Sequence, residues 1–447
     1  MFSSSLRRGR AALLAVTATV TVGQVALAPA ATAAPAPAPA PAPVTEAQPL
    51  APGTRFTTPV PDPGAVQQTI DLARADRFRD AALIAREAAT PQAMWFTDGT
   101  PKEVRQEVRR ASALARATRS VPTFVVYNVP GRDCSQYSAG GAADDAAYRA
   151  WIDGFAAGLM RDQQVVVVVE PDGLALMPGD CPPGTYPEGT APTDAGRLAD
   201  IAYAGEAIER ANPNALVYLD AGHTGWHNVG SIADRLQDAG VAEFQGLALN
   251  TSNYQYTPNL AQYGTWISEC LAVLPATYVH GVDADPCPNQ YWNGGPANGY
   301  VGDALDPFQQ WSDTATDPLA NTLGINQRYD ELLGDVEPTA HVVIDTSRNG
   351  QGPWAPAEGT YPDPQTWCNP PGRGLGPRPQ AAPDAAFPLV DAYLWVKTPG
   401  QSDGSCNRGI AGSTTDPEWG GITDPAAGAW FPEQALELAQ LAVPPLR

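Results

Sequence analysis

Short apolar runs rich in β-branched residues recur along the chain, and each run ends in polar side chains. They span residues 121–126, 165–169, 217–219, 247–249, 342–344 and 394–396. Runs of this kind are typical of strands that are buried on both faces, as in a parallel sheet. Apolar positions with helical spacing lie between them, over residues 101–119, 144–160, 194–211 and 432–441. This alternation predicts an α/β fold.

Polar residues at the carboxyl ends of parallel strands are typical of an active site in an α/β protein. Both a closed barrel and an open doubly wound sheet place the site at that edge, so the alternation alone leaves the two architectures open. Two local features support the helices. Asp144 and Asp145 suit a helix N-terminus, and Gly205 permits close packing on the apolar face of the helix over 194–211.

The first residues differ in composition from the rest of the chain. Met1–Ala33 has a basic start with Arg7, Arg8 and Arg10, continues with an apolar stretch and ends in the small residues Ala31-Thr32-Ala33. This order predicts a secretory signal peptide. A membrane anchor is the alternative, but Thr and Gly interrupt the stretch and a cleavage site follows it. Alternating Ala and Pro then predict an extended linker over residues 34–50. We expect one domain over residues 51–447.

Charge and cysteine content fit an exported protein. The net charge of −21 disfavours binding to nucleic acid or to anionic membranes and suits an extracellular enzyme with a neutral substrate. Six cysteines in an exported chain suggest three disulfides, whose pairing the residues alone leave open. The chain has no spacing typical of a zinc site, no nucleotide-binding fingerprint and no Gly-x-Ser-x-Gly elbow.

Five aspartates come just after the predicted strands: Asp133, Asp172, Asp220, Asp345 and Asp403. An isolated aspartate at such a place usually caps a helix, but five at matching strand ends favour a shared site. Glycoside hydrolysis uses two carboxyl groups, or one carboxylic acid and a held water, and burial among like charges keeps the acid protonated. Aromatic residues in the neighbouring segments offer flat faces for sugar rings: Trp95, Tyr127, Trp226, Trp367 and Trp395, of which Trp395 fits a core position equally well.

Several motifs resemble the signatures of glycoside hydrolase family 6, the inverting cellulases. The first is Val126–Cys134 followed by Ser138-Ala139-Gly140-Gly141, and the second is Val167–Leu174, which contains Glu170-Pro171-Asp172. Further stretches follow in the order of the family: Tyr218–Trp226, Val343–Gly350, Trp367-Cys368-Asn369, Trp395-Val396-Lys397 and Ser402-Asp403-Gly404. Two long signatures in the right order make the resemblance specific.

The resemblance implies a distorted (β/α) barrel with fewer than eight parallel strands, an active site at the strand C-termini, and neither metal nor cofactor. It implies that Asp172 is the general acid, and that Asp133 raises the pKa of this acid and stabilises charge on the sugar. Tyr127 matches the residue that presses on the distorted sugar. Asp403 matches the candidate base, and a water chain passing Asp133 and Ser138 is the competing account.

Other positions are implied to bind sugar: Trp95, Ser138, Asp220, His223, Trp226, Asn250, Trp367, Lys397 and Gln401. Gln401 stands where the family usually has Glu, and Val229 where a Trp is common. The resemblance also suggests Cys134–Cys181 and Cys368–Cys406 disulfides.

An insertion over about residues 259–335 distinguishes the chain from compact members of the family. Cys270 and Cys287 both lie in it and are expected to pair. With Tyr291, Trp292 and Trp311 it forms either an extra sugar-binding wall, which we favour, or a stabilised surface lobe.

Together these features predict a secreted inverting β-1,4-glucanase that acts on a β-glucan polysaccharide as a monomer. Endo action is favoured because the Cys134–Asp145 loop is short. A cellobiohydrolase is the alternative if the insertion roofs the cleft. A catalytically weakened glucan-binding protein is a second alternative.

Overall fold

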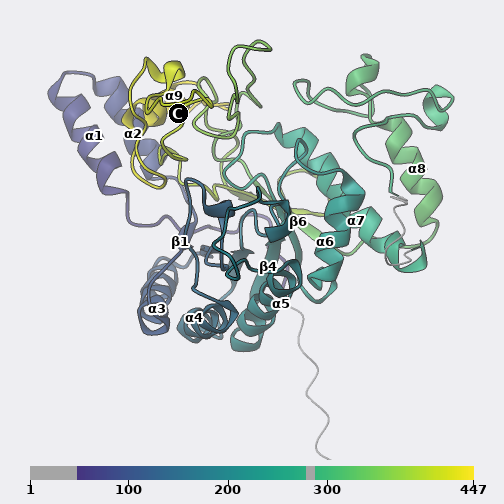
Figure 1. The fold of residues 1–447 in the computed structure, drawn as a ribbon, viewed down its shortest axis with the longest axis horizontal. Coiled ribbons are helices and arrows are strands. Elements are labelled where there is room, and N and C mark those ends of the chain that lie inside the picture. The colour runs from purple at the N-terminus through teal and green to yellow at the C-terminus, as the bar shows by residue number, and fades with distance from the viewer. Residues whose placement is uncertain (1–47, 278–286, 447) are drawn as a thin grey trace, which may run out of the picture. The chain divides into compact units, whose positions relative to one another are not determined.

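The computed structural model describes residues 48–277 and 287–446 (Figure 1). The expected signal peptide and residues 34–47 of the expected linker lie outside these residues. None of the helices in the described residues is long and apolar enough to cross a membrane.

An eight-stranded sheet forms the centre of the fold, in the order β1-β2-β3-β4-β5-β6-β8-β7. Seven of its strands are parallel and run in sequence order: β1 (Met94–Phe96), β2 (Thr123–Val126), β3 (Val165–Val169), β4 (Ala215–Asp220), β5 (Gly246–Leu249), β6 (His341–Asp345) and β8 (Val390–Leu394). The two-residue β7 (Gln380–Ala381) pairs with β8 in the antiparallel direction. The expectation of fewer than eight parallel strands is therefore confirmed.

The two faces of the sheet belong to different hydrophobic clusters. Val165, Val167 and Val169 pack outward against helices, together with Trp151 and Phe155 of α4 (Asp145–Gly158). Val166 and Val168 point to the other face, where they pack with residues of the other strands, such as Tyr218 and Leu394. An inner cluster made mostly of strand residues means that the sheet curls on itself. The distorted barrel is therefore confirmed over the open sheet.

Helices cover the outer face of the sheet (Figure 1). They are α3 (Pro101–Thr118), α4 (Asp145–Gly158), α5 (Asp194–Ala211), α6 (Val229–Asp238) and α7 (Thr257–Thr277). A further helix, α8 (Leu323–Leu333), packs on α7. Three further helices form a separate cluster with Leu375 and Trp395: α1 (Pro63–Arg74), α2 (Phe78–Ala88) and α9 (Pro432–Gln440). Figure 1 shows α1 and α2 beside α9, which brings the two ends of the described chain together.

Local sequence accounts for the helix boundaries. The Asp144 carboxylate caps α4 by accepting a hydrogen bond from the Ala147 amide at 2.8 Å, as its position predicted. A Cβ at Gly205 would lie 2.4 Å from the Phe244 ring, so α5 packs closely there. The expectation of a strand over residues 394–396 is wrong, because β8 spans Val390–Leu394 and ends where the expected strand begins. Trp395 is instead buried against the α1–α2–α9 cluster, which explains its apolar neighbourhood.

Candidate active site

A cavity of about 570 Å³ is lined by residues that follow the strands of the sheet. Ten residues expected at the site line it: Trp95, Tyr127, Asp133, Ser138, Asp172, His223, Trp226, Trp367, Lys397 and Asp403. Three of the five strand-end aspartates thus reach the cavity. The other two, Asp220 and Asp345, are buried and do not belong to its lining.

Asp172 is held in a tight turn directly after β3. Its φ is 63° and that of Glu170 is 51°, so the chain reverses sharply at Glu170-Pro171-Asp172. The Glu170 carboxylate fixes this turn to the end of β2 by accepting hydrogen bonds from the amides of Asn128 and Val129. The Asp172 amide donates to the Asp220 carboxylate at 3.0 Å. These contacts aim the Asp172 side chain into the cavity without using its own carboxyl group.

The surroundings of Asp172 favour its protonated form. Burial raises the pKa of Asp172 well above its ordinary value, and the carboxylates of Asp220 and Asp133 raise it further. The ammonium of Lys397 opposes this rise in pKa and is a smaller influence. Burial also raises the pKa of Asp220, to about 6, although the amides of Asp172 and Gly222 stabilise its anion. Asp172 can therefore carry a proton at neutral pH.

Asp133 begins a turn in which Asp133, Cys134 and Ser135 have φ values of 55°, 43° and 61°. The Ser138 amide donates to one Asp133 carboxylate oxygen at 2.6 Å. The Cys134–Cys181 disulfide anchors this turn to the loop after β3. Burial raises the pKa of Asp133, and the Ser138 hydrogen bond and Arg132 oppose that rise.

Tyr127 lies between these acidic groups and the aromatic wall. Its ring meets that of Trp95 edge-on at a centroid distance of 5.6 Å. The Arg132 guanidinium lies 4.7 Å from the centre of the Tyr127 ring and donates to the Ser138 carbonyl at 2.9 Å. Arg132 thus connects Tyr127 to the loop that holds Asp133.

Asp403 differs from the other two cavity aspartates because donors surround it. Arg348 donates to both carboxylate oxygens at 2.9 Å each, and Lys397 lies 3.3 Å from one of them. The Tyr254 hydroxyl and the Asn369 amide donate to the other oxygen at 2.9 and 3.0 Å. Burial alone would raise the pKa of Asp403, but Arg348 and Lys397 hold it below its ordinary value. Asp403 is therefore a fixed anion.

Three of these partners were not expected from the sequence: Arg348, Tyr254 and Asn369. Each lies on a loop far from Asp403 in the chain. Arg348 and Asn369 fall inside the family-like stretches Val343–Gly350 and Trp367-Cys368-Asn369, which was the available signal. The Asn369 side-chain oxygen also accepts a hydrogen bond from the Asp403 backbone amide at 2.8 Å, so each of the two residues donates to the other.

Asp345 and two expected sugar-binding residues make structural hydrogen bonds and do not line the cavity. The Asp345 carboxylate accepts four hydrogen bonds of 2.9 to 3.1 Å, from the backbone amides of Ser252, Ser347, Val396 and Lys397. The buried Asn250 side chain donates to the Asp345 carbonyl at 2.8 Å. The Gln401 amide donates to the Asp62 carboxylate at 2.9 Å. Neither Asn250 nor Gln401 reaches the cavity lining.

Aromatic and imidazole rings form much of the remaining wall. Trp226 lies beside His223 at a centroid distance of 5.7 Å. Burial lowers the pKa of His223 to about 4, so its imidazole is neutral at physiological pH. Trp367 is 36% exposed and lies beside Tyr137, with the ring centroids 5.8 Å apart.

The insertion contributes to this wall through residues other than those expected. Pro307 and Phe308 line the cavity. Tyr291 and Trp292 are exposed and are not part of its lining. Trp311 is buried and stacks on Trp266 at 6.0 Å, so it belongs to the core.

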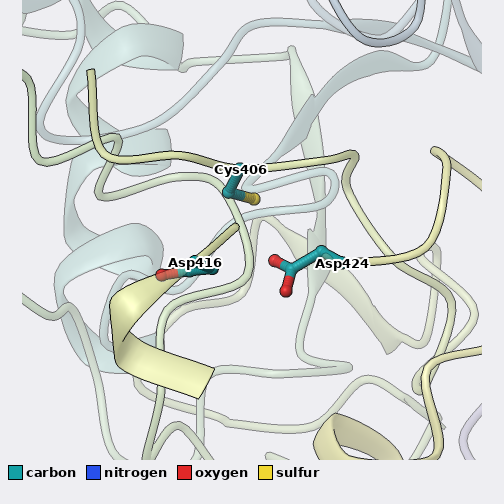
Figure 2. A group of neighbouring side chains, drawn as sticks. All are labelled: Cys406, Asp416 and Asp424. Carbon is teal, nitrogen blue, oxygen red and sulfur yellow. The ribbon is translucent and has the colours of Figure 1, made fainter. Parts of the chain in front are cut away.

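All three expected disulfides are present: Cys134–Cys181, Cys270–Cys287 and Cys368–Cys406. Figure 2 shows a group of neighbouring side chains around the last of these, made of Cys406, Asp416 and Asp424. The Cys406 sulfur is in the disulfide, and both Asp416 oxygens accept hydrogen bonds from Arg408. The group therefore offers a cation a poor set of ligands.

Comparison with known proteins agrees with this geometry. The sequence model of glycosyl hydrolases family 6 matches residues 53–442. Endoglucanase A of Thermobispora bispora is 32% identical over 82% of this chain and 58% of its own length. A probable 1,4-β-D-glucan cellobiohydrolase C of Aspergillus terreus is 30% identical over 72% of this chain and 59% of its own. This chain therefore matches little more than half the length of these relatives.

A solved structure gives a similar result. The endoglucanase Cel6 of Mycobacterium tuberculosis, in complex with methyl-cellobiosyl-4-deoxy-4-thio-β-D-cellobioside, is 31% identical to this chain, with a TM-score of 0.60. The match covers 88% of this chain and 99% of that one.

Proposed function

The chain belongs to glycosyl hydrolases family 6, and from this membership we propose that it is a secreted, endo-acting β-1,4-glucanase that inverts the anomeric carbon. The observation that carries the proposal is a cavity that holds three aspartates: Asp133, Asp172, whose surroundings raise its pKa, and Asp403, whose pKa Arg348 and Lys397 lower. A β-glucan chain lies in this cavity, with its rings on the apolar faces of Trp95, Trp226 and Trp367. The three disulfides suit an exported protein.

In this proposal Asp172 donates its proton to the glycosidic oxygen as the bond to the anomeric carbon breaks. An acid needs a pKa near or above the working pH. Burial and the nearby Asp220 and Asp133 provide that pKa for Asp172. Tyr127 lies against the same acidic groups and presses on the sugar at the cleavage point.

In the proposed step the attacking water bonds to the anomeric carbon as the bond to the leaving oxygen breaks. The proton that this water loses passes along a chain of waters beside Asp133 and Ser138 to the solvent, and does not end on Asp403. A carboxylate has about four lone-pair positions. Arg348, Lys397, Tyr254 and Asn369 supply five donor contacts to Asp403. Because these donors occupy the lone pairs of Asp403 and its pKa is lowered, Asp403 is a weak proton acceptor. Asp133 has a raised pKa and a single hydrogen bond from Ser138. Asp403 then stabilises the positive charge that develops on the sugar.

Endo action is supported by the make-up of the cavity wall. Residues 404–428, which follow Asp403, contribute no residue to the cavity lining. That segment is tied back to the body of the protein, for instance by the hydrogen bond of the Ser402 hydroxyl to the Pro425 carbonyl at 2.8 Å. A cleft without a roof from this segment admits the middle of a polymer chain.

The test is release of reducing ends from carboxymethyl-cellulose, with the wild type compared with Asp172→Ala. A large fall in viscosity for each bond cut is expected for endo action. Cellobiose as the sole early product would indicate a cellobiohydrolase. Equal release by both proteins would overturn the assignment. Binding without hydrolysis would indicate a glucan-binding protein that has lost its activity.

A further inference from the structure

The insertion is locked onto the loop that carries His223 and Trp226. The buried side chain of Gln290 donates to the carbonyls of Thr224 and His227, at 2.9 and 2.8 Å. Gln290 follows Cys287, which is joined to Cys270 of α7. The Tyr329 hydroxyl of α8 donates to the Pro288 carbonyl at 2.7 Å. Cys287 and Pro288, just before Gln290, are thus held by α7 and α8.

The same framework extends to Pro307 and Phe308. The Leu305 amide donates to the Gln290 carbonyl at 2.8 Å. On the other side, the Trp311 amide donates to the Asn259 side chain at 2.8 Å, and Asn259 donates to the Gln309 carbonyl at 2.9 Å. Both ends of the short segment that presents Phe308 are therefore hydrogen-bonded to buried residues.

Phe308 is half-exposed although the segment that carries it is hydrogen-bonded at both ends. The residue is 50% exposed, and it lines the cavity together with Pro307. A large apolar ring that is held in place and faces a cavity offers a ready contact surface for a ligand. The charged side chains that line the cavity come from the loops after the strands. The insertion contributes only two residues to the lining, the apolar Pro307 and Phe308.

We propose that Phe308 is a specificity-determining residue that binds a glucosyl unit remote from the cleavage point and so extends the substrate path. The proposal rests on the β-glucanase function proposed above. Asp172 follows β3, whereas Phe308 belongs to the segment between α7 and α8. Figure 1 shows α7 and α8 on the side of the sheet away from β1. In this proposal a long glucan chain extends from the catalytic carboxylates to Phe308. A short one leaves this ring uncovered.

The experiment measures the affinity for cellotetraose and cellohexaose by calorimetry, in an Asp172→Asn background that keeps the ligands intact. Phe308→Ala is expected to weaken cellohexaose binding by about threefold to tenfold, and to change cellotetraose binding by less than about twofold. Phe308→Trp, which keeps an aromatic face, should restore the preference for the hexaose. In the active protein, Phe308→Ala should raise KM for the hexaose and leave kcat unchanged.

Tyr291→Ala is the matched control, because Tyr291 is an exposed aromatic residue of the same insertion that does not line the cavity. It should alter neither affinity. Equal affinities of the Asp172→Asn parent and its Phe308→Ala variant for the hexaose, or equal weakening for both ligands, would overturn the role of Phe308 alone. Failure of the parent protein to bind either oligosaccharide would overturn the proposed function as well.

Discussion

Arg348 and Asp403 form a two-point ion pair in which both guanidinium–carboxylate contacts measure 2.9 Å. The Arg348 side chain is fully buried, and only 6% of the Asp403 side chain is exposed. A buried pair of this kind fixes the position of the carboxylate. It also makes the carboxylate a poor base, because protonation would leave Arg348 without a counter-charge.

The first prediction concerns the removal of Asp403. Asp403→Ala leaves Arg348 buried without its partner, so the free energy of unfolding should fall by about 3–5 kcal/mol. Hydrolysis should also decline strongly. Azide, which can replace a missing base as an external nucleophile, should not restore turnover, since Asp403 does not activate the water. Formation of an α-glycosyl azide by this variant, detected by mass spectrometry and NMR, would contradict the assignment and make Asp403 the base.

A second prediction separates the acid from the other carboxylates. Asp172→Asn should lower kcat on carboxymethyl-cellulose by about 10²–10⁴-fold, because the leaving oxygen then receives no proton. The loss should be much smaller on an aryl cellobioside with a 2,4-dinitrophenolate leaving group, which departs without protonation. Asp133→Asn is the comparison, because its kcat should fall on both substrates. Equal losses for Asp172→Asn on both substrates would remove Asp172 from the acid role.

The third prediction concerns Asp220 as a positioning residue. Its charge raises the pKa of Asp172, and its carboxylate accepts the Asp172 amide. Asparagine keeps the acceptor and removes the charge, so Asp220→Asn should lower the pKa of Asp172. Because Asp172 must be protonated to act, the alkaline limb of the kcat profile should move to lower pH by about one unit. Asp384→Asn, on an exposed residue outside the cavity, should leave the profile unchanged. An unshifted limb in Asp220→Asn would refute this coupling.

The sequence predicted best those features that depend on local pattern. The span 165–169 and the span 194–211 coincide with β3 and α5, because a continuous valine run and a regular apolar face each leave little choice of structure. β1 was missed because it has three residues, and Leu394–Val396 was misplaced because a tertiary contact buries Trp395.

In the candidate site, too, the residues marked by local sequence were predicted and the contacts made between distant loops were not. Asp133, Asp172 and Asp403 were identified from their places after strands and from motifs, and all three line the cavity. Which donors surround each carboxylate could not be predicted, because Arg348, Tyr254 and Asn369 approach Asp403 from separate loops. Phe308 was missed for the same reason, since nothing near it in sequence marks a position that faces the cavity.

The last prediction concerns the carboxyl pair of Asp416 and Asp424 (Figure 2). Burial, together with the nearby Asp416 anion, raises the pKa of Asp424 from 3.8 to about 7, against a hydrogen bond from Asn369 and the charge of Arg408. Between pH 3.8 and about pH 7, Asp424 is therefore protonated in the folded state and ionised in the unfolded state. Its stabilising effect is present below pH 3.8 and is lost as the pH rises toward 7.

Above pH 7 the folded protein carries a second buried anion beside Asp416. Asp424→Asn removes that anion, retains an acceptor for Asn369 and adds a donor for Asp416. It should raise Tm at pH 8 by about 1–3 °C and flatten the pH dependence of stability between pH 4 and 7. Asp416→Asn should instead lower Tm at every pH, because Arg408 then lacks its buried partner. Thermal melts of the three proteins from pH 4 to 8 provide the measurement, and a lower Tm of Asp424→Asn at pH 8 would show that the Asp424 anion stabilises this loop.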